Sequence, residues 1–360
     1  MTIDDANIIW LDLFEFLTYS KKEKLLKLFN KGENIRKDFL KKKEIKDILS
    51  EQEFNKMAVC LEDAFLNRIL NQYSNEGVEC VTFYDERYPY LLKEISTPPF
   101  CLYCKGNTQL LSTICVAIVG SRKPSEYGLV VTKQFAKELA KQDITIVSGM
   151  AVGVDTIAHK SALEENGKTI AVLGGGFNHI YPAINNSLAR KITENNLLVS
   201  EYNPNVRPQT YYFPTRNRII AGLSHGVVLT EAGEKSGSLK TADYAIEFNR
   251  EIFAVPGRIN AETSKGTNML IKNLQGCITL CPEDVLSALN ININNKKQNV
   301  GIQLDMNAEL VLNYIQTDKK TFQELADLTK MEVKELNILL MQLEMEGVVT
   351  KLSGNSYIMS

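Results

Sequence analysis

The sequence predicts an α/β protein in which a doubly wound, mostly parallel sheet lies between an all-helical domain and a winged-helix domain. Through the middle of the chain, short β-branched runs alternate with amphipathic helices. Those runs are continuously apolar, as strands are when helices cover both faces of a parallel sheet. The 360 residues also suffice for about two to three domains. The central fold is therefore predicted to be Rossmann-like.

Residues 1–75 are expected to form the all-helical domain. Apolar residues recur there at three- and four-residue steps, as at Leu11, Phe14 and Leu17. A lysine-rich stretch, Lys37–Lys46, alternates with apolar side chains. This stretch fits either the solvated face of a helix or a contact to a nucleic-acid backbone, and the sequence leaves both interpretations open.

Residues 76–289 are expected to hold the sheet. Its parallel strands are predicted at Val116–Val119, Ile144–Val147, Thr169–Leu173, Leu197–Ser200, Val227–Thr230, Ile252–Val255 and Ile278–Leu280. The helices between them are predicted at Gly128–Lys141, Asp155–Asn166, Ile184–Glu194 and Leu239–Asn249. Gly167 follows one of these helices and supplies the residue type that commonly ends a helix.

The remaining residues are expected to form a linker and a winged helix. Residues 290–304 are expected to be the linker, because residues 290–300 are polar and rich in asparagine. In residues 305–360, helices are predicted at Asn307–Ile315, Thr321–Leu328 and Glu332–Glu346, followed by a hairpin of Val348–Leu352 and Tyr357–Met359. The third helix carries more glutamate than lysine, so we expect it to bind protein or pack on the core rather than lie in a DNA groove.

Composition narrows the possible environments of the chain. It carries 41 Lys and Arg against 43 Asp and Glu, for a net charge of −2 at pH 7. This balance gives no bulk attraction to a polyanion, so any site for one must be built by local geometry. Seven scattered cysteines suit a reducing cytosol, and we expect a cytoplasmic protein. There is no run of about 18 apolar residues and no signal-peptide pattern, so no membrane association is expected.

Small and basic residues follow the predicted strands. In an open parallel sheet, ligands bind beyond the carboxyl ends of the strands, where helix N-termini point free amides outward. Glycine lets backbone amides approach a phosphate, and serine hydroxyls and arginine guanidinium groups complete an anion site. Five such turns are expected on one edge: Gly120–Arg122, Ser148–Gly153, Gly174–Asn178, Phe213–Arg218 and Glu231–Ser238. These turns predict a phosphate-binding edge.

Several other kinds of site lack support in the sequence. The dinucleotide pattern G-x-G-x-x-G, the triphosphate pattern G-x-x-x-x-G-K-[ST] and the nucleophile pattern G-x-S-x-G are absent. Cys101 and Cys104 have a zinc-like spacing, but on the expected strand they point to opposite faces. His159 lies within a predicted helix and is interpreted as packed. We therefore expect no metal, no cofactor and no catalytic residue.

The order of these motifs resembles the DNA-processing protein A (DprA, also called Smf) family. The similar stretches are Ala117–Arg122, Ser148–Asp155 with Ala158-His159, Phe213–Ser224, Glu231-Ala232 with Ser236–Leu239, Phe253–Gly257, and Gly266–Asn268 before Leu270-Ile271. The resemblance is dense over residues 80–285. It extends more loosely to an N-terminal domain similar to sterile-alpha-motif or helix-hairpin-helix modules and to the winged helix.

The resemblance implies a function and a set of partners. It implies a cytosolic protein that binds single-stranded DNA in the Rossmann-like domain, protects incoming strands and helps load RecA recombinase in natural transformation. It also implies a homodimer formed through that domain.

The resemblance and the strand-end motifs together predict the residues that contact DNA. They are Gly120, Ser121, Arg122, Ser148, Gly149, Gly153, Gly174, Gly175, Gly176, Phe177, Arg216, Asn217, Arg218, Ser236, Gly237, Ser238 and Lys240. Lys240 stands where the family usually has an aliphatic residue, and it adds a positive charge nearby. Four aromatic residues could stack with bases or could belong to the core: Phe177, Tyr211, Tyr212 and Phe213.

Two other classes of function remain open at this point. The first is an enzyme of the phosphoribohydrolase type, which hydrolyses nucleoside monophosphates. Glu231, paired with Arg216 or Arg218, could imitate the site of such an enzyme. The second is a protein-interaction scaffold that binds no nucleic acid.

Overall fold

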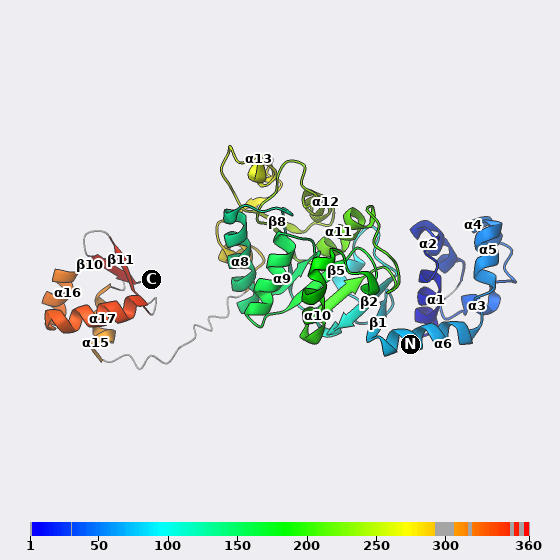
Figure 1. Cartoon of the computed structure of the whole chain (residues 1–360), viewed down its shortest axis with the longest axis horizontal. Coiled ribbons are helices and arrows are strands. Elements are labelled where there is room, and N and C mark those ends of the chain that lie inside the picture. Colours follow the sequence, from blue (N-terminus) through cyan, green and yellow to red (C-terminus); the bar gives the residue numbers. More distant parts are fainter. Residues whose placement is uncertain are drawn as a thin grey trace. The chain divides into compact units, whose positions relative to one another are not determined.

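The computed structural model describes residues 2–29, 31–291, 306–315, 319–345, 349–352 and 356–359. They fall into two compact units, residues 1–293 and residues 294–360, hereafter unit 1 and unit 2 (Figure 1). The expected linker falls largely outside the described residues, and the expected domain boundary near residue 75 stays a prediction.

Unit 1 begins with short helices. They are α1 (Ile3–Asp12), α2 (Tyr19–Leu28), α3 (Ile35–Asp38), α4 (Ile45–Ile48), α5 (Glu51–Ala58) and α6 (Asp63–Asn75). The starts of α1 and α5 follow from the sequence, because Thr2 and Ser50 each form a capping box with the acidic residue three positions later. Trp10 is fully buried at the centre of this helical part, and its indole nitrogen donates a hydrogen bond of 2.7 Å to the carbonyl of Cys60.

The rest of unit 1 is built around a nine-stranded sheet. Its strands are β1 (Val78–Thr82), β2 (Cys101–Gly106), β3 (Cys115–Val119), β4 (Thr145–Ser148), β5 (Thr169–Leu173), β6 (Leu197–Ser200), β7 (Gly226–Leu229), β8 (Glu251–Ala254) and β9 (Cys277–Ile278). The strand order is β1-β2-β6-β5-β4-β3-β7-β8-β9. The strands from β3 to β9 pair in parallel, whereas β2 is antiparallel to both β1 and β6. The predicted mostly parallel sheet is confirmed.

Helices cover both faces of this sheet, as the doubly wound prediction requires. One face is covered by α8 (Glu126–Lys141), α9 (Val154–Glu164) and α14 (Pro282–Ala288), which pack on the apolar side chains that the central strands direct to that face. On the other face lie α7 (Tyr90–Lys93), α11 (Tyr212–Leu223) and α12 (Leu239–Glu247). Alternate residues of one strand serve the two faces: Val116 and Ile118 face α8, and Ala117 and Val119 face α11.

Helix α11 corrects one expectation. The sequence predicts Phe213–Arg218 as one of the turns at the sheet edge, but these residues form the first half of α11. The reason is the position of Pro214, which lies in the first helical turn, where a missing amide hydrogen costs no hydrogen bond. The motif therefore presents its side chains from a rigid helix.

Unit 2 contains the elements expected of its sequence. Its helices are α15 (Met306–Ile315), α16 (Phe322–Thr329) and α17 (Val333–Met345), and its strands β10 (Lys320–Thr321), β11 (Val349–Leu352) and β12 (Ser356–Met359) pair in the order β10-β12-β11. Buried apolar residues from all three helices, with Val349 and Tyr357, form a core of its own. Three helices beside a small antiparallel sheet agree with the predicted winged helix.

Candidate functional site

The strand order places a cleft at one point of the sheet edge. Chain connections run in opposite directions from β3 and β7, which are neighbours, so the loops after these two strands diverge. A cleft of about 1190 Å³ opens there. It is lined by residues of the loops after β3 and β7, by one side of α11, and by Glu262 and Thr263. The predicted edge therefore carries a cavity at its topological switch point.

The loop after β3 is held rigidly against its neighbours. The amide of Ser121 donates a hydrogen bond of 2.8 Å to the carbonyl of Glu231, and the Ser121 carbonyl accepts one of 3.1 Å from Val154. Gly153 has φ +82°, and a Cβ there would lie 2.4 Å from the Ser121 carbonyl oxygen. Only glycine fits this close approach, so Gly153 fixes the position of the loop.

The carboxylate of Glu231 fastens the same loop. It is 1% exposed and accepts hydrogen bonds of 2.7 Å from both the amide and the hydroxyl of Ser125, the residue that caps α8. Glu231 does not line the cleft. The phosphoribohydrolase alternative needs this carboxylate to face a substrate, and in the structure it supports the fold instead.

Arg216 and Asp155 form the floor of the cleft. Arg216 is 4% exposed, and one guanidinium nitrogen donates hydrogen bonds to the carbonyls of Gly149, at 2.7 Å, and Val172. A carboxylate oxygen of Asp155 accepts hydrogen bonds from the amides of Gly149 and Ala151, at 3.1 and 3.3 Å. Burial lowers the pKa of Arg216 to about 10, an effect that the Asp155 charge opposes. Burial likewise raises the pKa of Asp155, against the charge of Arg216.

The rim of the cleft is cationic and exposed. Its basic residues are Arg122, Lys123, Lys235 and Lys240. Of these, only Lys240 makes an ion pair within the described residues, at 3.5 Å to Asp243. With Arg216, five cations face the three carboxylates that line the cleft, those of Asp155, Glu234 and Glu262. The cleft is therefore positive in a chain whose net charge is negative.

Backbone amides add to this positive character. Among the described residues, the amides of Arg122 and Gly237 have no hydrogen-bond acceptor. A Cβ at Gly237 would meet no atom within 4 Å, so this glycine faces the open cleft. The hydroxyls of Ser236 and Ser238, 2.8 Å apart, lie on either side of it. Free amides beside hydroxyls and cations are the elements of a phosphate site.

Two aromatic rings line the cleft. Tyr181, which is 58% exposed, and Phe213 have ring centroids 5.3 Å apart and planes inclined at 44°. Of the four candidate stacking residues, Phe213 lines the cleft. Tyr181 also lines it, but it was not among the candidates predicted from the sequence. Its signal in the sequence is an aromatic residue before proline in the loop that follows β5.

The other candidate aromatics lie elsewhere. Phe177 is 8% exposed and belongs to the apolar core. Tyr212 stacks on Tyr202 with ring centroids 4.0 Å apart, and the exposed Tyr211 packs edge-on against Tyr212. None of these three residues lines the cleft.

The structure divides the predicted DNA-contacting residues into two sets. Those that line the cleft are Gly120, Ser121, Arg122, Arg216, Asn217, Ser236, Gly237, Ser238 and Lys240. Those that do not are Ser148, Gly149, Gly153, Gly174, Gly175, Gly176, Phe177 and Arg218. The DNA contacts of both sets remain predictions, and the second set has structural partners.

Residues of the second set hold the strand ends and loops around the cleft in place. The Ser148 hydroxyl donates a hydrogen bond of 2.7 Å to the carbonyl of Ile118, which ties β4 to β3. A Cβ at Gly176 would lie 2.3 Å from the carbonyl oxygens of Asn203 and Pro204. Arg218 is 7% exposed and pairs with Glu201 at 2.5 Å, on the side of α11 away from the cleft.

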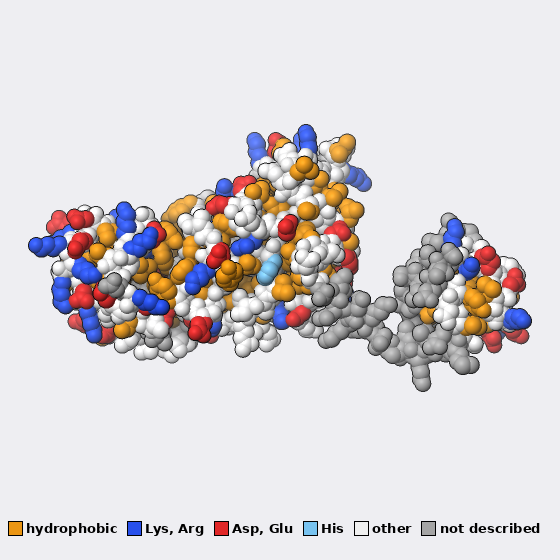
Figure 2. Space-filling model, turned by 180° about the vertical axis from the view of Figure 1, so that it is seen from behind, with side chains coloured by type: hydrophobic (Ala, Val, Ile, Leu, Met, Phe, Trp, Pro, Cys, Tyr) orange, Lys and Arg blue, Asp and Glu red, His pale blue; other side chains and the backbone are white. Residues whose placement is uncertain are grey.

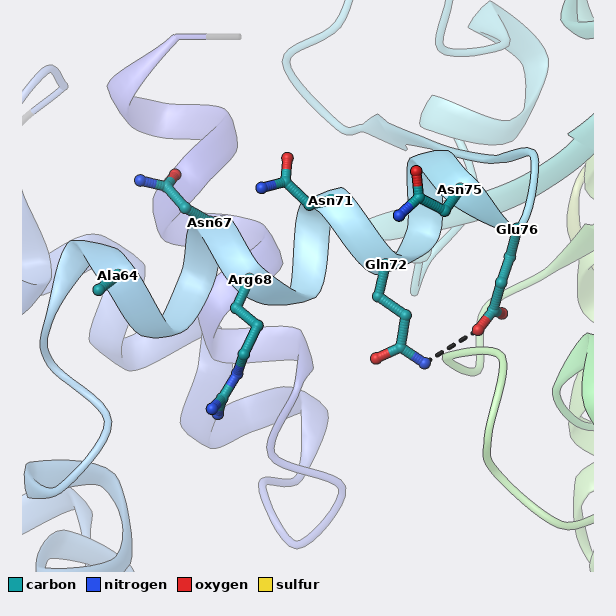
Figure 3. Close-up of a pocket in the computed structure, with 7 residues that line it drawn as sticks. All are labelled: Ala64, Asn67, Arg68, Asn71, Gln72, Asn75 and Glu76. Atoms are coloured by element: carbon teal, nitrogen blue, oxygen red, sulfur yellow. Dashed lines mark hydrogen bonds between the residues drawn. The ribbon is translucent and has the colours of Figure 1, made fainter.

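A second concave surface provides a contrast. It lies along α6, where Asn67, Asn71 and Asn75 succeed one another on one side of the helix (Figure 3). Gln72 donates a hydrogen bond of 2.9 Å to Glu76 across the next turn. Arg68 is the single cation among the residues that line this surface, and one helix supplies all of them. It lacks the converging loops and charges of the cleft at the switch point.

The described residues contain neither a metal-type cluster nor a membrane-spanning helix. No three His, Cys, Asp or Glu side chains there are grouped as a metal site requires. No helix within the described ranges combines the length and the apolar composition that crossing a membrane needs.

The fold and the cleft define a Rossmann-like α/β protein with a cleft rich in basic residues at its switch point. The model of the family DNA recombination-mediator protein A matches residues 79–290, and the chain belongs to this family. DNA processing protein DprA from Bacillus subtilis (strain 168) is 42% identical over 208 residues, which are 58% of this chain and 70% of the relative. The expected resemblance is confirmed.

Solved structures agree with this assignment. The X-ray structure of DNA processing protein A from Streptococcus pneumoniae has a TM-score of 0.68 and 34% identity, and the match covers 80% of this chain and 98% of that chain. For DNA processing protein A from Helicobacter pylori the TM-score is 0.55 and the identity 34%, over 60% of this chain and 97% of that chain. Both likenesses confirm the predicted fold class.

Proposed function

We propose that this chain binds single-stranded DNA in the cleft at the switch point. The observation that supports this most is the gathering of exposed cations and unbonded amides in one cleft, around Arg122, Lys235 and Gly237. Membership of the family supports it too, because the relative from Helicobacter pylori is described as having a unique single-stranded DNA binding mode.

The chemistry of the cleft favours binding that does not depend on sequence. Cations and amides bind phosphates, which are the same in every nucleotide. Tyr181 and Phe213 offer ring faces on which a base can stack, and stacking tolerates any base. A base that stacks on these rings has to be unpaired, so the cleft selects single strands over duplex.

Fluorescence anisotropy with labelled 20-nucleotide oligonucleotides tests this function. Single strands of several sequences should bind at least about tenfold more tightly than the matching duplexes, or roughly 1.4 kcal/mol. The affinity should fall as salt rises, because phosphate contacts release counterions. Equal affinity for the two forms would contradict the proposal.

We further propose that the bound strand is protected and handed to RecA recombinase in the cytoplasm. The support is family membership, together with seven cysteines that are all free thiols. A nuclease assay should show slower digestion of the bound strand. RecA filaments should also form faster on strands coated with single-strand binding protein when this chain is added. Unchanged filament growth would remove the RecA step and leave the binding proposal standing.

We also propose that the chain forms a homodimer through unit 1. Between Ile259 and Leu280, which includes α13 (Lys265–Lys272) and β9, several apolar side chains are exposed, among them Ile259 at 95% and Leu274 at 93%. Figure 2 shows hydrophobic side chains beside Lys and Arg on the projecting part of unit 1 that carries α13 in Figure 1. Sedimentation velocity should show a dimer that Ile259→Glu together with Leu274→Glu weakens.

A further inference from the structure

Helix α17 of unit 2 presents an apolar strip on its outward face. Its inward face is formed by Leu336, Leu340 and Leu343, which are at most 2% exposed and belong to the core of the unit. On the opposite side, Ile338 is 55% exposed and Met341 is 64% exposed. These two residues are three positions apart, so they are neighbours on the helix surface. An apolar surface rimmed by polar residues is the kind of surface at which proteins associate.

The residues around the strip carry more negative than positive charge, with Glu335 and Glu344 against Lys334. Glu335 and Gln342 lie on one side of Ile338 and Met341, and Asn337 and Glu344 lie on the other, as the 3.6-residue period places them. All four are exposed, and none makes a hydrogen bond or ion pair within the described residues. Carboxylates beside an apolar strip repel phosphates, so the strip fits a protein surface.

We propose that the outward face of α17 binds the same face of a second copy of this chain, with the two helices antiparallel. A two-fold axis at the middle of the strip places Ile338 against Met341 of the other copy, and Met341 against its Ile338. Such self-complementarity is what a two-fold interface requires. The proposal concerns unit 2 and does not require DNA binding by unit 1.

The polar residues select the antiparallel orientation. In that orientation Glu335 of one copy faces Gln342 of the other, and Asn337 faces Glu344, because like flanks meet in an antiparallel pair. Each carboxylate then has an amide donor opposite it, and no two carboxylates meet. A parallel pair would instead place the two Lys334 side chains side by side, and like charges in contact weaken an interface. Charge complementarity therefore favours one arrangement of two copies.

The proposed contact between the two helices buries a small area. One face of a 13-residue helix buries less area than the interfaces of stable dimers do. We therefore expect weak pairing that gains strength when copies are held close together, for example on one DNA strand.

Photo-crosslinking of the full-length protein tests the arrangement. A photo-crosslinking residue replaces Asn337, and light- and heavy-isotope chains are mixed so that mass spectrometry identifies crosslinks between copies. The antiparallel pair predicts intermolecular crosslinks to the turn around Glu344. The matched control is the same crosslinker at Gln323, an exposed residue of α16. Crosslinks from position 337 that are no more frequent than those from position 323 would overturn the proposal, and so would crosslinks confined to the 337 region itself.

Charge substitutions give a second, independent test. Gln342→Lys places a cation opposite Glu335 and should raise the yield of the position-337 crosslink at least about threefold, whereas Gln342→Glu should lower it by a similar factor. Gln323→Lys and Gln323→Glu make the same charge changes on α16 and should leave the yield unchanged. Because Gln342 is exposed, neither substitution disturbs the core. Equal yields for the two Gln342 variants would contradict the antiparallel pairing.

Discussion

The floor and the rim of the cleft use the same residue types for different purposes. On the floor, Arg216 is buried, and its guanidinium group binds two backbone carbonyls. On the rim, Arg122 is exposed and makes no ion pair within the described residues. Both are arginines in motifs at the sheet edge, yet one holds strand ends together and the other is free to meet a ligand.

Glycine shows the same division. Gly153 on the supporting side has a positive φ and touches the loop after β3, whereas Gly237 on the rim faces open space. This difference shows that one motif can contain residues that hold the cleft in shape and residues that are exposed to a ligand. Changes on the floor should therefore lower stability first, and changes on the rim should lower binding alone.

The largest expected effect is on the floor. Arg216→Ala should lower the free energy of unfolding by about 2–3 kcal/mol, because the buried carbonyls of Gly149 and Val172 lose this donor. The substitution also removes the positive charge that opposes the raised pKa of Asp155. Urea unfolding measures this loss. Adding Asp155→Asn should recover part of it, since no lone charge then remains. A loss below about 1 kcal/mol would place Arg216 with the rim residues.

The two glycines provide a matched pair. Gly153→Ala should cost about 2–3 kcal/mol of stability, because its Cβ would overlap the Ser121 carbonyl in a conformation that favours glycine. Gly237→Ala should change stability by less than about 0.5 kcal/mol. It should nevertheless weaken single-strand binding about threefold or more, roughly 0.6 kcal/mol, because a methyl group then enters the cleft. Similar thermal stabilities for the two variants would remove the distinction between floor and rim.

The stability of the protein should fall at acid pH because of His159, which is buried. Burial lowers the pKa of His159 to about 3, and the nearby charge of Arg216 acts in the same direction. Between that value and the unfolded pKa near 6.5, the unfolded state binds a proton that the folded state does not, so stability falls as pH falls. The contribution of this residue should amount to about 2 kcal/mol between pH 7 and pH 5.

Urea unfolding at several pH values, compared with His159→Gln, checks this expectation. The variant loses the hydrogen bond between the imidazole and the Thr169 hydroxyl, so it should be less stable at pH 7. Its stability should nevertheless depend less on pH over the same interval. Parallel pH profiles for the two proteins would show that His159 is not the titrating group.

The smallest expected change in stability belongs to the rim. Arg122→Ala should alter the free energy of unfolding by less than about 0.5 kcal/mol, while weakening single-strand binding by about 1–3 kcal/mol for every sequence. The slope of log affinity against log salt should become shallower by about 0.7, which corresponds to one phosphate contact. Arg190→Ala removes an exposed arginine of α10 (Asn186–Asn195) outside the cleft and serves as the control. Unchanged binding with a clear loss of stability would make Arg122 structural.

The sequence predicts the sheet well, because buried parallel strands carry a local signal. The expected strand Thr169–Leu173 matches β5, and Leu197–Ser200 matches β6. The turn expected at Phe213–Arg218 was wrong, because these residues form the first half of α11, and Pro214 is compatible with the first turn of a helix. The edge of the sheet at which the cleft lies could be predicted, because it is the edge where the carboxyl ends of the parallel strands meet.

The division between floor and rim could not be predicted, because long-range contacts decide it. Arg216 meets carbonyls 67 and 44 residues away in sequence, and no local pattern reports such a meeting. Gly174–Gly176 resembles a phosphate-binding loop in the sequence, but other parts of the chain pack against it. Phe213 lies against Gly174, and the segment from Asn203 to Pro208 lies against Gly175 and Gly176. Phe177 and Tyr181 are both aromatic residues in the loop after β5, and only the packing shows which one reaches the cleft.

The hydrogen bonds of Glu231 have a consequence for synthesis of the protein on the ribosome. This residue positions the loop after β3, yet it follows Ser121 by 110 residues and Ser125 by 106. The loop after β3 therefore lacks one set of its hydrogen bonds until β7 has been made and has entered the sheet. A nascent chain that ends before residue 231 has the contacts of Gly153 and Val154 to this loop but lacks those of Glu231. The loop is therefore expected to reach its final position only in chains that extend past β7.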